Sequence, residues 1–227
     1  MKRYFFTVVL GIFFAVSAVA QEKPFLLGFK FSPGVSWYKP HSSGLERESV
    51  GVDFAGGIIA DVRLVENYFF ETGLFYDFQS GNLTYQTEYN GAAGKLSRDY
   101  QVQYVEIPMT LKMCTNRFGK LRFFGLGGFK TSFRIVASAN DMWRSQAESK
   151  NMKRDATKDF AFLKESLLFG IGTDFFLDKS THLTLGINYT TSITNVANSS
   201  MECFYDGNWE KAKFSNNILE LRLGIIF

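Results

Sequence analysis

Residues 25–37 read FLLGFKFSPGVSW, and nearly every second side chain in this stretch is bulky and apolar. The intervening positions, from Gly28 through Lys30 to Ser36, are small or charged. A period of two residues places such sets on opposite faces of a β-strand. The stretch therefore predicts a strand with one apolar face and one small, polar face.

The same alternation recurs along most of the chain, which has 227 residues with 17% aromatic side chains and only 4 Pro. Aromatic residues favour strands, and Pro disfavours them. Together with residues 25–37, seven further segments give eight candidate strands: 50–62, 68–79, 100–113, 121–135, 160–177, 183–193 and 219–227.

Alternation alone does not say which face meets water. A soluble lipid-carrying barrel would bury its apolar face. Three features favour the opposite arrangement: the segments are long enough to cross a bilayer at a tilt, the polar faces mix Gly and Ser with charges of both signs, and the chain ends inside a strand. The sequence therefore predicts an all-β transmembrane, antiparallel up-and-down β-barrel of about eight strands, with the soluble carrier as the alternative.

The first twenty residues have the pattern of a secretory signal peptide. Lys2 and Arg3 precede an apolar run that ends at Ala18-Val19-Ala20, so we expect cleavage between Ala20 and Gln21. An N-terminal anchor helix is the weaker alternative because the apolar run is short. This divides the chain into a signal peptide, 1–20, and a barrel domain, 21–227, and no later apolar stretch is long enough for a transmembrane helix.

Short and long connections between the segments alternate. Those around 65–67, 116–119 and 178–180 are short, whereas 39–49, 80–98, 137–158 and 197–214 are long and polar. Barrels of the Gram-negative outer membrane have short periplasmic turns and long extracellular loops. We therefore expect both termini in the periplasm.

The last segment alternates apolar residues up to the final Phe227. A terminal strand of this kind resembles the signal by which the barrel-assembly machinery recognises outer-membrane barrels for insertion. We assign that signal to Leu223, Ile225 and Phe227.

Charged residues on the polar faces should lie in the barrel interior. A barrel of about eight strands is only wide enough for side chains, and buried charges must be paired. We therefore expect a plugged, charge-paired lumen, with a narrow charged conduit as the alternative. The predicted network comprises Lys30, Asp53, Glu71, Asp77, Glu106, Lys112, Arg122, Lys130, Arg134, Lys164, Asp174, Glu220 and Arg222.

Pro108 and the two cysteines can also be placed in the predicted barrel. Pro108 should face the lumen beside Glu106, where a bulge or a water would meet the carbonyl left unpaired opposite it. Cys114 should lie at the periplasmic end of its strand and Cys203 in the last extracellular loop, too far apart for a disulfide.

We expect no enzyme, cofactor or metal site. The two His are scattered, and His182 lies at the periplasmic end of a strand. The alternative is an outer-membrane hydrolase or acyltransferase that uses His41 with neighbouring Ser42 or Ser43 and Glu46 or Glu48 in the first long loop. A general base must lie within hydrogen-bond reach of its nucleophile, which a sequence does not establish.

The long loops are the remaining candidates for interaction. Basic residues of 137–158, including Lys153 and Arg154, are suited to the phosphates of lipopolysaccharide in the surrounding outer-membrane lipid. Aromatic residues of the last loop suit either the membrane-interface girdle or an envelope protein partner. The net charge of +3 is too small to indicate a nucleic acid.

At Tyr104-Val105-Glu106-Ile107-Pro108 the sequence resembles the Tyr-x-Glu-Ile-Pro strand of the PorT-like outer-membrane β-barrel family. The strand with Gly28, Lys30 and Gly34, the stretch Gly125–Phe129 and the stretch from Gly186 to Val196 are also similar to that family. The resemblance implies an integral outer-membrane barrel. The family's named member takes part in protein secretion across the outer membrane, and most members have no known task.

Overall fold

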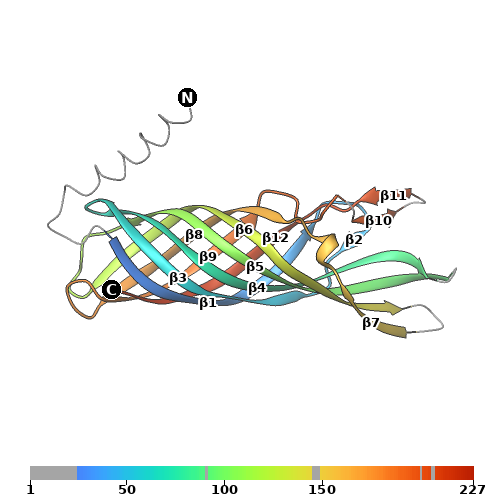
Figure 1. The fold of residues 1–227 in the computed structure, drawn as a ribbon, viewed down its shortest axis with the longest axis horizontal. Helices are drawn as coiled ribbons and strands as arrows, with labels where there is room; N and C mark the ends of the chain where they lie inside the picture. Colours follow the sequence, from blue (N-terminus) through green and yellow to red (C-terminus); the bar gives the residue numbers. More distant parts are fainter. Residues whose placement is uncertain (1–24, 90–91, 145–148, 200, 206–207) are drawn as a thin grey trace, which may run out of the picture.

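The computed structural model describes residues 25–89, 92–144, 149–199, 201–205 and 208–227. Over these residues the chain forms one closed barrel whose long axis runs horizontally in Figure 1. Its eight wall strands are β1 (Phe25–Pro40), β3 (Val50–Val65), β4 (Tyr68–Tyr89), β5 (Ala92–Cys114), β6 (Leu121–Arg144), β8 (Leu163–Phe176), β9 (His182–Ser192) and β12 (Phe214–Ile226).

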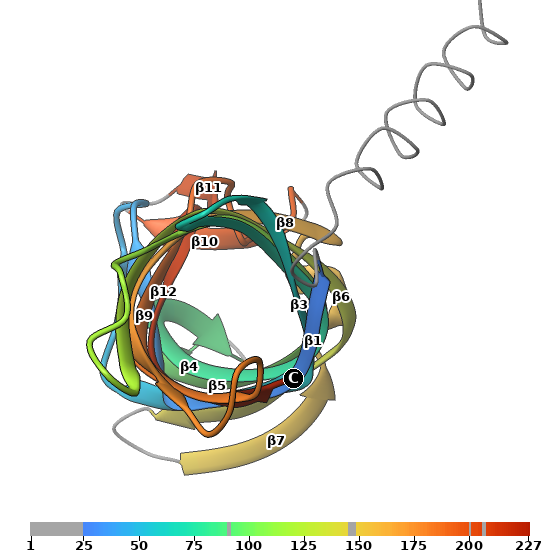
Figure 2. The ribbon, with the colours of Figure 1, turned by 90° about the vertical axis from the view of Figure 1, so that its left-hand side faces the viewer.

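Each wall strand pairs antiparallel with the next one along the chain, and β1 pairs with β12 to close the ring (Figure 2). Even the last residue takes part, because Phe227 and Leu27 exchange two backbone hydrogen bonds. A closed ring leaves no unpaired strand edge, which is what a strand structure in lipid requires. The predicted fold class, an antiparallel eight-stranded barrel, is confirmed.

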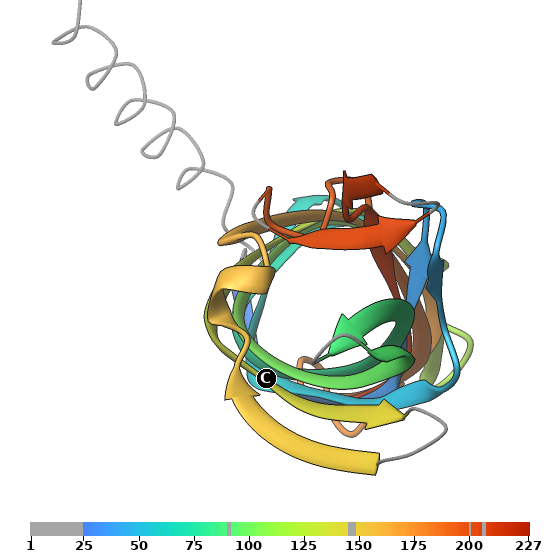
Figure 3. The same ribbon diagram turned by 90° about the vertical axis from the view of Figure 1, so that its right-hand side faces the viewer.

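The three short connections, the start of β1 and the end of β12 all lie at one end of the molecule, at the left of Figure 1. We call this the turn end and the opposite one the loop end. Small elements decorate the loop end (Figure 3): β2 (Leu45–Glu46), β7 (Ser149–Asp155), the 3₁₀ turn η2 (Thr157–Asp159), β10 (Glu202–Tyr205) and β11 (Asn208–Lys211). In the described part of the chain, no helix is long and apolar enough to cross a membrane.

The outer wall is apolar and the interior is polar. Phe29 and Ile171 on the outside are 58% and 70% exposed, whereas Lys112 and Arg222 on the inside are fully buried. A soluble carrier would show the reverse. The apolar belt instead matches a wall that faces lipid.

Two predicted loops are strands, which corrects the sequence analysis. β4 and β5 continue through most of residues 80–98, and β6 and β7 occupy much of 137–158. Shorter strands also occur in the first and last long connections. These stretches lie on the loop-end side of the apolar belt, so their outward side chains are polar. Because of that polarity they resemble loops in the sequence.

Strand β5 shows how the two faces exchange polarity. Its outward side chains are apolar from Met113 to Val105 and then polar from Gln103 to Lys95. Its inward side chains change in the opposite sense, from Lys112 and Glu106 to Tyr104, Tyr100 and other mostly apolar groups. On the turn-end side of Tyr104, the barrel has an apolar exterior and a polar interior. On the loop-end side, its interior is mostly apolar, like the core of a soluble protein.

Pro108 interrupts pairing without a bulge. The residues that pair between β4 and β5 go from Thr72 and Met109 directly to Phe75 and Glu106, with no change of register. The missing N–H of proline accounts for the gap. The irregularity lies instead between β5 and β6, next to Gln103 and Tyr104, at the level where the faces exchange polarity.

Candidate functional site

The structure places twelve of the thirteen predicted lumen charges in the buried interior, and Arg134 is only partly buried. Asp61 and His182 are buried near the turn end with them. Alternation along β3 already put Asp61 on the polar face. His182 begins β9 at the turn end, as its position in the sequence predicts, but it faces inward.

The ion pairs nearest the turn end gather around Asp174 on β8. Its carboxylate lies 3.1 Å from Lys112 Nζ and 2.8 Å from Arg122 Nη2. Lys112 also reaches Asp61 at 3.2 Å, so two acids and two bases neutralise one another across the barrel. All four side chains are largely excluded from solvent, and this cluster closes the lumen at its turn end.

The next pair along the axis joins Glu71 on β4 to Arg222 on β12. The guanidinium donates Nη1 to Oε1 at 2.7 Å and Nη2 to Oε2 at 2.5 Å, and its Nε reaches Thr184 Oγ1 at 3.3 Å. Such a two-pronged pair fixes both side chains in orientation as well as in charge. It links two wall strands that are separated in the ring by β3 and β1.

Toward the loop end, the interior pairs use lysines. Lys130 Nζ lies 2.8 Å from Glu106, which also accepts a hydrogen bond from Ser132 at 2.8 Å. Lys164 donates to Gln79 at 2.8 Å. Asp53 differs from these residues, because it is 1% exposed and neither carboxylate oxygen has a hydrogen-bond partner among the described residues.

An aromatic cluster covers this polar lumen at the loop end. Tyr38, Tyr100, Phe160 and Phe214 are fully buried, with ring centroids 4.9–6.2 Å apart. The ring of Tyr38 occupies the space that a Cβ would take at Gly81, which explains glycine there. We call these four rings the aromatic cap.

A further group of ion pairs lies among the loop-end extensions. Arg98 donates Nε and Nη2 to the two oxygens of Asp141, both at 2.6 Å. Arg154 from the predicted lipopolysaccharide-binding loop pairs with Asp141 at 3.4 Å and with Asp159. This arginine therefore forms ion pairs within the protein while its side chain stays 38% exposed.

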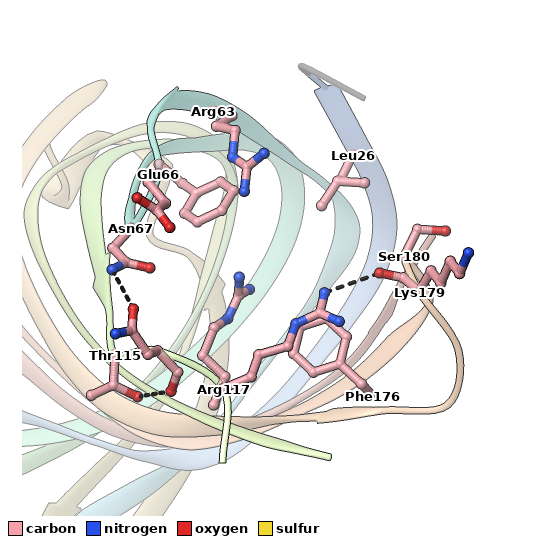
Figure 4. A pocket seen from close by; sticks show the side chains of 12 residues that line it. Leu26, Arg63, Glu66, Asn67, Thr115, Arg117, Phe176, Lys179 and Ser180 are labelled. Carbon is pink, nitrogen blue, oxygen red and sulfur yellow. Dashed lines mark hydrogen bonds between the residues drawn. The ribbon is translucent and has the colours of Figure 1, made fainter. Parts of the chain in front are cut away.

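A pocket of about 710 Å³ opens at the turn end, and we call it the vestibule (Figure 4). Residues from all three short connections and from β1 line it. Its ionisable lining residues are four cations and one acid: Arg63, Arg117, Arg122, Lys179 and Glu66. Sequence reasoning missed this site because its residues come from turns far apart in the chain.

Aromatic rings hold the vestibule's guanidinium groups in place. Arg117 stacks on Phe176 at 3.5 Å from the ring centroid and donates to the carbonyl of Lys179 at 3.0 Å. Arg122 lies 5.0 Å from the rings of both Phe69 and Phe176. Burial and the neighbouring guanidinium groups of Arg122 and Arg63 lower the pKa of Arg117. The vestibule therefore brings guanidinium groups together, and one of them, Arg122, is paired with Asp174.

Several residues of the suspected catalytic set have other partners. His41 Nε2 lies 3.0 Å from Ser215 Oγ, and Ser42 Oγ donates to the carbonyl of Lys211 at 3.0 Å. Glu46 and Glu48 each form an ion pair with Lys95. Among the described residues, no group of three or more His, Cys, Asp or Glu is arranged to hold a metal.

His41 belongs instead to a groove of about 610 Å³ on the outer wall, where β1, β9 and β12 leave the apolar belt. Trp37 and Tyr189 lie at its lower edge, with ring centroids 6.4 Å apart. Lys39 and Lys213 are exposed in the same groove. The groove thus combines an aromatic edge with positive charge at the boundary of the belt.

Three other predictions concern the chain ends and the cysteines. Leu223, Ile225 and Phe227 lie on the outer wall at the turn end and are 37–47% exposed. Cys114 is a free thiol at the same end, whereas the side chain of Cys203 lies outside the described residues. The predicted cleavage site, Ala20 and Gln21, also lies outside them.

Three solved structures align with this chain over most of its length. OprG from Pseudomonas aeruginosa is 10% identical, with 89% of this chain and 95% of that chain covered and a TM-score of 0.44. Neisserial surface protein A is 10% identical, with coverages of 90% and 96% and a TM-score of 0.41. The outer membrane protease OmpT from Escherichia coli is 8% identical, with coverages of 93% and 99% and a TM-score of 0.40.

No curated protein sequence matches the chain. The family model described as "Outer membrane protein beta-barrel domain" matches residues 19–198, which is most of the sequence. This match agrees with the apolar outer wall and the closed ring of eight strands. The chain therefore belongs to the outer membrane protein beta-barrel domain family.

Proposed function

We propose that this outer-membrane barrel is a non-conducting structural or interaction module without an active site. The observation that carries the proposal is the double closure of its interior. Ion pairs such as Glu71–Arg222 cross the lumen, and the aromatic cap covers it. With about eight strands, side chains alone fill a barrel.

Conductance measurements test this proposal. The mature chain, inserted into planar bilayers, is expected to give no discrete current steps while a porin in the same bilayer does. Steps of reproducible size would contradict the closed interior and favour the narrow-conduit alternative.

In the orientation we propose, the turn end faces the periplasm and the loop end faces the exterior. The loop-end extensions then form the surface for an envelope protein partner. Within this proposal, the Tyr104–Pro108 strand supports membership of the PorT-like group and with it a link to protein secretion. Cross-linking in intact cells tests that link: secretion subunits attached at the loops would support it, and their absence from the cross-linked products would contradict it.

We further propose that the outer-wall groove contacts phosphate groups of lipopolysaccharide. An acyl chain on the apolar belt would bring a headgroup to the level of Trp37 and Tyr189, where Lys39 and Lys213 supply positive charge. Mass spectrometry of the barrel with bound lipid A is expected to show less retained lipid for Lys39→Gln/Lys213→Gln. Lys120→Gln/Lys158→Gln, which removes two exposed lysines outside the groove, is the matched control. Equal loss in both variants would contradict a specific contact.

A further inference from the structure

We infer that the outer-wall groove binds the sugar ring of a glycolipid headgroup, with the apolar face of the pyranose packed on Trp37 and Tyr189. That the sugar belongs to lipopolysaccharide rests on the lipid contact proposed above. In that contact, Lys39 and Lys213 meet the phosphates of the headgroup. The recognition of the ring itself stands on the outward side chains of three neighbouring strands, β1, β12 and β9.

Two aromatic rings form the edge of the groove nearest the apolar belt. Trp37 on β1 is paired with Asn217 on β12, and Tyr189 on β9 is paired with Leu219, the next outward residue of β12 toward the turn end. The two rings therefore flank β12, with centroids 6.4 Å apart. Asn217 is buried beside them, and its Oδ1 accepts a hydrogen bond from the Tyr189 hydroxyl at 3.1 Å, which orients that ring. We call Trp37 and Tyr189 the ring pair.

Polar side chains continue the groove on the loop-end side of the ring pair. Thr191 is paired with Asn217, and Ser215 is the next outward residue of β12. Ser215 Oγ lies 3.0 Å from His41 Nε2, and both side chains line the groove. Short hydroxyl side chains leave open space over the wall. The resulting volume of about 610 Å³ falls within the roughly 300–1,000 Å³ typical of ligand sites.

A pyranose has the polarity that this arrangement matches. Its C–H groups form an apolar face that packs on an aromatic ring, and aromatic side chains offer a large, rigid surface for it. The hydroxyl groups around its edge donate and accept hydrogen bonds, as Ser, Thr and His side chains also do. A phosphate or phosphoglycerol headgroup has no such apolar face. The groove therefore favours a sugar ring over a phosphate alone.

The level of the groove favours a sugar that carries acyl chains. On the turn-end side of the ring pair, Val35, Leu219 and Ile187 are 41–49% exposed and belong to the apolar belt. An acyl chain on this surface places an attached sugar beside the ring pair. Aromatic residues are common at the membrane interface, but an aromatic girdle alone does not account for the polar groove next to the rings.

Intrinsic fluorescence tests the inference. The chain has three tryptophans, so Trp143→Phe/Trp209→Phe leaves Trp37 as the reporter. This variant of the mature chain, folded in zwitterionic detergent micelles, is titrated with lipid A, with dephosphorylated lipid A and with phosphatidic acid. Both sugar lipids are expected to change the Trp37 emission. Phosphatidic acid, which carries a phosphate and acyl chains without a sugar, should leave the emission unchanged.

A matched pair of tyrosine variants in the same background locates the site. Tyr189→Leu removes one ring of the pair and should weaken the binding of dephosphorylated lipid A at least about fivefold. Tyr76→Leu removes an exposed tyrosine of similar exposure on β4, outside the groove, and should change the affinity less than about twofold. Circular dichroism verifies that both variants remain folded.

Three results would overturn the inference: equal weakening in both tyrosine variants, an equal Trp37 response to phosphatidic acid, or a response to lipid A that vanishes on dephosphorylation. The last two results would leave the phosphate contact of Lys39 and Lys213 in place. Conversely, a response to dephosphorylated lipid A together with unchanged lipid retention in Lys39→Gln/Lys213→Gln would support the sugar site and contradict the phosphate contact. The two proposals can therefore fail separately.

Discussion

At the scale of single residues, the buried ionisable side chains of the interior are of two kinds, those with a hydrogen-bond partner and those without one. Arg222 and Glu71 satisfy one another with two hydrogen bonds, whereas Asp53 is equally buried and has no hydrogen-bond partner among the described residues. An unpaired buried charge is costly, and removing one member of a buried pair creates one. The two sites should therefore respond to substitution in opposite directions.

Arg222→Leu is expected to lower the free energy of unfolding by about 3–5 kcal/mol, because it leaves the Glu71 carboxylate buried alone. Glu71→Leu/Arg222→Leu should recover part of that loss. Urea titration of the barrel in lipid vesicles measures both. Asp53→Asn serves as the comparison and should leave stability unchanged or raise it; a loss as large as that of Arg222→Leu would show that Asp53 is paired.

Tyr100 gives a pH dependence outside the membrane belt. Burial raises the pKa of this phenol above its ordinary value of 10.0. A group whose pKa is higher in the folded state stabilises the fold fully below its unfolded pKa, and this contribution is lost as the pH rises. We expect the free energy of unfolding to fall above about pH 10. Tyr100→Phe should fall less steeply, and parallel curves would exclude Tyr100 as a cause.

The face of the barrel wall on which a residue lies could be predicted from the sequence much better than the residue with which it pairs. Alternation alone placed Lys112, Glu106 and Arg222 on the inward face, because side-chain direction has a strict period of two. Which acid meets which base depends on strand stagger and tilt, which adjacent residues do not encode. The vestibule was missed for the same reason, since Arg63, Arg117 and Lys179 meet only when three turns close into one ring.

At the scale of elements, the exchange of polarity along β5 marks the boundary between lipid and water. The part of each strand nearer the turn end is predictable from the sequence, because its outward face is apolar. Residues 80–98 resemble a loop in the sequence because the outward face there is polar and the inward face supplies the apolar groups. The irregular register near Tyr104, between β5 and β6, adds a local break in the pattern.

This boundary predicts two different costs for the same substitution on one face of β5. Met109→Arg places a charge on the apolar belt and should reduce the free energy of folding in lipid by about 2–4 kcal/mol. Gln101→Arg lies above the boundary on the same outward face and should cost about 0–1 kcal/mol. Folding titrations in vesicles compare the two, and equal costs would misplace the boundary.

At the scale of the whole molecule, the apolar belt and the two different ends define an object that suits a membrane in one of two orientations. A closed ring with an apolar exterior requires lipid or detergent around it. This requirement agrees with the match to an outer-membrane family. A mature chain that stays folded and monodisperse in plain buffer would contradict that exterior.

Labelling of intact cells tests the orientation. In a Cys114→Ser/Cys203→Ser background, Ser199→Cys at the loop end should react with a membrane-impermeant maleimide, because that end is proposed to face outward. Lys120→Cys at the turn end should react only after lysis. The reverse pattern would invert the proposed topology and would move the vestibule to the cell exterior.

The exchange of polarity on β5 also fixes how deeply the barrel is immersed. If the barrel shifted along its axis by one residue pair relative to the bilayer, a ring of amides and charges would enter the hydrocarbon at one rim. Aromatic rings would be exposed to water at the other rim. A rigid wall of eight paired strands cannot relieve this by stretching. Where bilayer thickness does not match the belt, we therefore expect the neighbouring acyl chains to compress or extend, so that the protein imprints its own thickness on the surrounding lipid.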